Sequence, residues 1–196
     1  MITALNKQTA LVLIDLQKGI LAGDKAHPLE DVLKNAAALV DGFHQSGLPV
    51  AIVNVNPAGA AWTRSRKDAT MQSPPQKGQQ AGFPKEFLEI VDEIPTHPDD
   101  IFVTKHTWNA FFETELHQKL REHNVTGIVL GGVSTSIGVE GTARAAVELG
   151  YNVSFATDAM TDRVLEAHNN SLQYIFPRIG ESGTTADILN MLSQKG

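Results

Sequence analysis

Five short apolar runs, separated by segments with helical periodicity, restrict the folds open to this chain more than any other feature. The runs cover residues 10–14, 50–55, 101–103, 128–130 and 153–156, and all but the last are rich in branched aliphatic side chains. Runs of this length and composition are typical of strands that are buried on both faces. Their alternation with helices predicts right-handed crossovers and a mostly parallel sheet.

The helices are predicted from apolar stripes at spacings of three and four residues. The clearest stripe ends before Gly47 and consists of Leu29, Val32, Leu33, Ala36, Leu39, Val40 and Phe43. A second helix is expected over about 111–123, with Phe112, Leu116 and Leu120 inward. A third is expected over 137–149, capped by Gly150, with Val139, Ala143, Ala146 and Val147 inward. Two more are expected over about 163–176 and 186–192.

These elements predict one α/β domain spanning residues 1–196, because no linker or change of composition divides the chain. The expected architecture is a three-layer α/β/α Rossmann-like sandwich around a mostly parallel sheet of about six strands.

Charge and composition argue against several classes of function. A net charge of −6 disfavours nonspecific binding to nucleic acid or to anionic membranes. The apolar run at 10–14 ends at Asp15 and is too short for a signal peptide or a membrane span, so a cytoplasmic protein is expected. The chain has no cysteine, which excludes disulfides, zinc-thiolate sites and thiol nucleophiles. Its histidines show no paired ligand spacing, so we expect neither a metal nor a cofactor.

Polar residues follow four of the predicted strands. They are Asp15, Asn56, Lys105 and the segment from Ser134 to Gly138. In open parallel sheets the binding site lies beyond the carboxyl ends of the strands, so these residues are expected in one crevice. The start of the helix after Val133 also presents backbone N–H groups that can hold a carboxylate or an oxyanion. Each residue also has a simpler interpretation: a turn cap, a surface charge or a serine helix cap.

Three segments resemble the signature segments of the isochorismatase-like hydrolase superfamily. They are Val12-Leu13-Ile14-Asp15-Leu16-Gln17, Lys105-His106-Thr107-Trp108-Asn109-Ala110-Phe111 and Gly132-Val133-Ser134-Thr135-Ser136-Ile137-Gly138-Val139-Glu140-Gly141-Thr142-Ala143-Arg144. Thr157-Asp158-Ala159 and Phe176-Pro177-Arg178-Ile179-Gly180 also fit, so the resemblance spans nearly the whole chain.

The resemblance implies an Asp, Lys and Cys triad in most members. Asp15 and Lys105 match the first two, whereas Gly138 stands where the cysteine would be. Isochorismatases proper are similar at that point because they also lack the cysteine. They carry a Gln-Pro after the second strand, where this chain has Asn56-Pro57. The resemblance further implies a cis peptide at Val133–Ser134, amides of Ser134 and Gly138 directed at a ligand, and a homodimer or larger homo-oligomer.

The leading function is hydrolysis of a small carboxylated enol ether such as isochorismate, with Asp15 as general acid, Lys105 pairing with the substrate carboxylates and Gly138 making room for substrate. The expected substrate-binding residues are Gln17, Asn56, Trp108, Val133, Ser134, Ile137 and Arg64. Arg64, Arg66 and Trp62 belong to a polar segment, 57–84, that is predicted to be a loop over the crevice. Two alternatives stay open: a catalytically silent binder of small anions or of a partner, and an amide hydrolase that uses water activated by Asp15.

Overall fold

The computed structural model describes residues 2–58 and 83–194. It contains a six-stranded, fully parallel sheet with the order β3-β2-β1-β4-β5-β6. The strands are β1 (Thr9–Ile14), β2 (Val50–Val55), β3 (Ile101–Lys105), β4 (Gly127–Val133), β5 (Asn152–Thr161) and β6 (Glu181–Gly183). The predicted α/β sandwich with a parallel sheet is therefore confirmed.

The helices differ widely in length. The α-helices are α1 (Lys18–Leu21), α2 (Leu29–Gln45), α4 (Lys85–Leu88), α5 (Leu116–Glu122), α6 (Glu140–Glu148), α7 (Leu165–Asn170) and α8 (Thr185–Ser193). Two π-helical turns, η2 (Thr135–Val139) and η3 (Ser171–Ile175), and one 3-10 turn, η4 (Phe176–Arg178), complete the described elements. No helix among the described residues is long and apolar enough to span a membrane.

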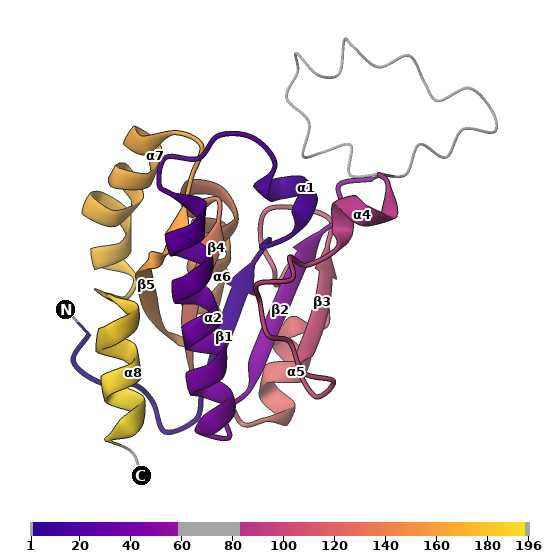
Figure 1. Ribbon diagram of the computed structural model, residues 1–196. Coiled ribbons are helices and arrows are strands. Elements are labelled where there is room, and N and C mark those ends of the chain that lie inside the picture. The colour runs from indigo at the N-terminus through magenta and orange to yellow at the C-terminus, as the bar shows by residue number, and fades with distance from the viewer. Residues whose placement is uncertain (1, 59–82, 195–196) are drawn as a thin grey trace.

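Two apolar clusters lie on opposite faces of the sheet. On one face, α2 and α8 pack over the central strands through residues that include Leu39, Phe43 and Ile188. On the other face, α5 and α6 contribute residues such as Leu120 and Ala143. Figure 1 shows α2 and α8 in front of the sheet and α5 and α6 behind it. Side chains alternate between the faces of a strand, so covering both faces requires the continuous apolar runs seen in the sequence.

The direction of strand addition reverses between β1 and β4. From β1 the chain adds β2 and β3 on one side, and β4, β5 and β6 then follow on the other. A crevice opens at such a switch point, at the carboxyl ends of the two strands. The residues that follow β1 and β4 are Asp15 and Ser134, so the topology brings two of the predicted polar elements together.

Two predicted helices are shorter than expected. The helix predicted over 111–123 begins only at Leu116, and Phe112 is 46% exposed rather than inward. Glu113 has a φ of 53°, which a right-handed helix cannot accommodate. The helix predicted over 163–176 is α-helical only from Leu165 to Asn170, and it continues as π-helical and 3-10 turns that include Pro177. Proline has no N–H with which to continue the α-helical pattern.

Two further expectations about burial were wrong. Phe102 of β3 is 57% exposed, because β3 is an edge strand and the cluster beneath α2 and α8 contains none of its residues. Val147 is 40% exposed, since the buried stripe of α6 is limited to Thr142, Ala143 and Ala146. Gly150 does end that helical segment, at a φ of 87°.

Candidate active site

A buried ion pair between Asp15 and Lys105 forms the floor of the site. Nζ of Lys105 lies 2.7 Å from Oδ2 of Asp15 and 2.9 Å from the carbonyl oxygen of Thr107. The two residues are 5% and 1% exposed. Asp15 adopts a φ of 54°, so the chain turns sharply as it leaves β1. Removing one partner of such a buried pair lowers the stability of the fold by about 3–5 kcal/mol, because the remaining charge is left buried and uncompensated.

The second carboxylate oxygen of Asp15 is buried and has no hydrogen-bond partner among the described residues. Burial penalises the charged carboxylate and raises the pKa of Asp15, whereas the charge and hydrogen bond of Lys105 lower it. The effect of burial is the larger one, and the pKa of Asp15 rises to about 6. At pH values near neutrality this carboxyl group can therefore either donate or accept a proton.

A cavity of about 260 Å³ opens above this pair. Among the described residues its walls are mainly apolar, and its lining consists of Asp15, Ile20, Val55, Pro57, Lys105, His106, Thr107, Trp108, Val133, Ser134, Ile137 and Gly138. Trp108 is 58% exposed and Ile137 is 44% exposed, so both lie at the rim. Seven residues expected to be catalytic or to bind substrate line this cavity, and they come from segments far apart in the chain. They are Asp15, Lys105, Trp108, Val133, Ser134, Ile137 and Gly138.

The loop after β4 approaches the floor closely. Gly132 has a φ of 115°, and a Cβ atom there would collide with the backbone of Ile14, so only glycine allows the two strands to meet in this way. The peptide between Val133 and Ser134 is cis, as the resemblance implied. A Cβ atom on Gly138 would lie 2.9 Å from Cγ2 of Ile14 and 3.4 Å from Oδ2 of Asp15. The position expected for a thiol is therefore adjacent to the carboxylate and is partly filled by a methyl group of Ile14.

Side chains behind the loop hold it in place. The amide and hydroxyl of Ser136 both donate to Oδ2 of Asp162, each at 2.8 Å. Oγ1 of Thr135 lies 2.8 Å from Nδ1 of the buried His168. The simple interpretation of Ser134 as a side-chain helix cap is wrong, because its side chain makes no cap hydrogen bond. These contacts orient the loop, and sequence reasoning had assigned no role to Asp162 or His168.

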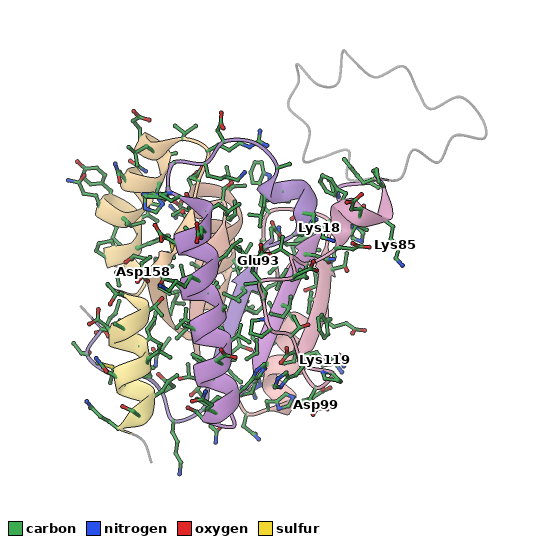
Figure 2. The ribbon with its side chains drawn as sticks, viewed as in Figure 1. Lys18, Lys85, Glu93, Asp99, Lys119 and Asp158 are labelled. Carbon is green, nitrogen blue, oxygen red and sulfur yellow. The ribbon has the colours of Figure 1, made fainter. Side chains whose placement is uncertain are left out.

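Two predicted substrate-binding residues do not line the cavity. The buried carboxamide of Gln17 donates to the carbonyls of Val55 and Phe87 and accepts from the amide of Val55. It thereby ties the start of α1 to β2 and α4, which lie at the same end of the molecule as the labelled Lys18 and Lys85 in Figure 2. The side-chain oxygen of Asn56 accepts from the amide of Ala58 in a turn. Both side chains are used to shape the backbone.

Arg64, Arg66 and Trp62 lie outside the described residues, as does most of the segment predicted to form a loop over the crevice. Sequence reasoning missed four lining residues: Ile20, Val55, His106 and Thr107. Their common signal was position, since each lies within a few residues of a predicted strand end. The described residues contain no group of three or more His, Asp or Glu side chains placed to hold a metal ion.

Fold and site together define a doubly wound α/β protein with an acid–cation pair at its topological switch point. The isochorismatase domain model matches residues 9–187, and the chain belongs to the isochorismatase family of hydrolases. It is similar to YwoC of Bacillus subtilis, an uncharacterized isochorismatase family protein, with 42% identity over 187 residues that cover 95% of each chain. The structure of an isochorismatase family protein from Burkholderia thailandensis has a TM-score of 0.84 at 35% identity, over 97% of this chain and 98% of that one.

A more distant relative carries a different activity in its name. The ureidoacrylate amidohydrolase RutB of Pseudomonas syringae is 30% identical over 163 residues, which cover 74% of this chain and 66% of the relative. Membership of the family therefore does not by itself choose between ether and amide bonds.

Proposed function

We propose that this chain is a thiol-independent hydrolase in which Asp15 supplies a proton to a small carboxylated enol ether such as isochorismate. The observation that carries the proposal is the state of the Asp15 carboxyl group. One oxygen is held by Lys105, the other is buried without a partner among the described residues, and the pKa is raised to about 6. A group of this kind can deliver a proton near neutral pH.

The first chemical step follows from the needs of the bond. Protonation of the vinyl carbon of an enol ether converts the ether carbon into an oxocarbenium ion, to which water then adds. Asp15 lies at the floor of a cavity with mainly apolar walls, which favours the neutral, proton-carrying form of its carboxyl group. No thiol is needed for this step, which agrees with the absence of cysteine.

Lys105 has two roles in the proposal. It holds Oδ2 of Asp15, and with two of its three N–H groups used by Asp15 and Thr107 it keeps one for a substrate carboxylate. An anion bound beside Lys105 would weaken the pull of the ammonium on Asp15, so substrate binding would raise the pKa of Asp15 further. Arrival of the substrate would thereby increase the fraction of Asp15 that carries the proton.

Gly138 supports the proposal through the space that it leaves. A Cβ atom on Gly138 would lie 3.4 Å from Oδ2 of Asp15 and 2.9 Å from Cγ2 of Ile14, so even the smallest side chain would crowd both groups. Because no side chain stands at Gly138, a planar enolpyruvyl carboxylate can approach the amides of the 134–138 loop.

Amide hydrolysis is a second candidate, favoured by the similarity to a ureidoacrylate amidohydrolase. In that reaction the ionised form of Asp15 would take a proton from water, and Lys105 would favour that ionised form. The two candidates therefore require opposite protonation states of the same side chain.

A substrate screen tests the proposal directly. Purified protein is incubated with isochorismate and with a panel of small amides and ureides, and release of pyruvate and of ammonia is measured. Pyruvate release that disappears in Asp15→Asn supports the enol-ether proposal, whereas ammonia release alone supports the amidase. Affinity for small carboxylates without any turnover would support a silent binder. Assembly as a homo-oligomer and a cytoplasmic location stay predictions, which light scattering and cell fractionation test.

A further inference from the structure

We propose that His106 is the second catalytic residue of this site, the base that takes the proton from the attacking water. This inference rests on the proposed hydrolysis. His106 follows Lys105, the last residue of β3, and lines the same cavity. No part of the proposal above uses it.

The hydrogen bond of His106 determines which ring nitrogen carries the proton. Nδ1 of His106 lies 2.8 Å from the carbonyl oxygen of Asn56. A carbonyl oxygen can only accept a hydrogen bond, so Nδ1 must carry the hydrogen, and in the neutral ring Nε2 is left with a free lone pair. The amide of Asn56 in turn donates to the carbonyl of Lys105 at 2.8 Å, so the acceptor is itself held by the ladder between β2 and β3. The ring is therefore anchored with its basic nitrogen on the side away from the anchor.

The other titratable groups of the cavity are already committed. Among the described lining residues these groups are Asp15 and Lys105. Asp15 has given up its proton to the substrate when water attacks, and in the reaction below its carboxylate, held at Oδ2 by Lys105, takes up the later proton of the hemiketal. Lys105 is a donor to both Asp15 and Thr107. His106 is the one further titratable side chain among the described lining residues, and residues 59–82 contain no histidine.

With His106 included, the reaction closes without a net change in the protein. Asp15 transfers its proton to the vinyl carbon, and the π electrons form the new C–H bond and leave the ether carbon cationic. The oxygen of water bonds to that carbon while Nε2 of His106 takes one of its protons. The resulting hemiketal collapses as its hydroxyl proton passes to Asp15, its C–O bond to the alcohol breaks, and His106 returns a proton to the departing oxygen. Water is consumed, the ketone and the alcohol leave, and both residues regain their starting states.

The substitution His106→Asn removes the base but can keep the hydrogen bond to the Asn56 carbonyl. The side-chain NH₂ of asparagine can replace Nδ1–H as donor to the Asn56 carbonyl, but the amide has no basic nitrogen. We expect kcat for isochorismate to fall by about 100-fold or more, the usual contribution of general acid–base catalysis, while KM changes by less than about threefold. The matched control is His123→Asn at an exposed position after α5, which should match the wild type.

Two measurements exclude a purely structural role. The acid limb of the kcat/KM profile, which reports loss of the free base at low pH, should disappear in His106→Asn and persist in His123→Asn. Added imidazole should restore pyruvate release in His106→Ala, in proportion to its concentration, but not in Asp15→Asn. A kcat within threefold of the wild type, an unchanged acid limb or no imidazole rescue would overturn the assignment while leaving the role of Asp15 intact.

A measurement without substrate tests the starting geometry. In ¹⁵N-labelled protein the neutral ring of His106, assigned by its loss in His106→Asn, should show the proton on Nδ1. A neutral ring with its proton on Nε2 would overturn the inference even if isochorismate is hydrolysed. Failure of the wild type to release pyruvate would instead refute the proposed function and this role together.

Discussion

The pH dependence of hydrolysis provides a direct test of Asp15, because the two candidate reactions need opposite forms of it. Burial raises the pKa of this carboxyl group to about 6 against the lowering effect of Lys105. If the protonated form is required, the fraction available falls from about one half at pH 6 to about 0.01 at pH 8, so kcat/KM should have an alkaline limb on which the contribution of Asp15 falls about 50-fold. The fall would approach tenfold per pH unit at its alkaline end.

Initial rates of pyruvate release at low isochorismate concentration, measured across pH 5–9, report kcat/KM and hence the ionisation of the free enzyme. Replacing Lys105 with methionine removes the cation beside Asp15, so the alkaline limb should move upward by about 1–3 pH units. KM should also rise, because the substrate carboxylate loses the ammonium group that binds it. A kcat/KM that rises through pH 6 to a plateau, with no alkaline limb, would refute the acid role and favour water activation by ionised Asp15. An alkaline limb at the same pH in Lys105→Met would refute the effect of Lys105 on the pKa of Asp15.

The remaining predictions concern the floor of the site and its loop. Since the folded-state pKa of Asp15 lies above its ordinary value of 3.8, this group favours the fold most below pH 3.8, and that contribution is lost as the pH rises through about 6. Urea unfolding of the wild type should therefore show that the free energy of unfolding falls by up to about 3 kcal/mol between pH 4 and 7, and Asp15→Asn should lack this fall. An equal pH dependence of the unfolding free energy in the two proteins would contradict the titration of a buried Asp15. In Gly138→Cys the new side chain crowds Ile14 and Asp15, so pyruvate release should fall at least about tenfold. Gly138→Ala is the smaller matched change. A cysteine variant as fast as the wild type would disprove the role of Gly138 in making space. Activity should survive dialysis against EDTA, and a loss that a divalent ion restores would reveal a metal site among the acidic and histidine side chains. Ser134→Ala should retain most activity, because only its backbone amide is proposed to serve, and a fall of 100-fold would give its hydroxyl a role.

The strands were predictable because their signal is local. A strand covered on both faces is apolar at nearly every position, and the runs at 10–14 and 128–130, and that at 50–55 apart from Asn54, satisfy this without reference to the rest of the chain. The polar residues that end these runs were predictable for the same reason, and two of them, Asp15 and Ser134, line the cavity. The short strand β6 (Glu181–Gly183) carried no such signal, because its three residues are only partly buried.

The chemistry of the site depended on contacts between segments far apart in the chain. The sequence placed Lys105 after a strand and the resemblance matched it to the same triad as Asp15, but only the order of strands in the sheet places its Nζ 2.7 Å from Asp15, a residue 90 positions away. The same packing surrounds the second oxygen of Asp15 with protein and raises its pKa, a property that no local pattern encodes. Gln17 and Asn56 were predicted to bind substrate because they follow strands, but their side chains form hydrogen bonds with backbone groups instead.

The sequence by itself determined the class of fold, the absence of a thiol and the positions at which polar side chains leave the sheet, since each is a property of residue type and local spacing. The tertiary structure decided how those side chains are used. It paired Asp15 with Lys105, directed Nδ1 of His106 to the Asn56 carbonyl, and placed a methyl group of Ile14 against the space that Gly138 leaves. Proton affinity and free volume depend on every atom within a few ångströms, and those atoms come from strands that only folding brings together.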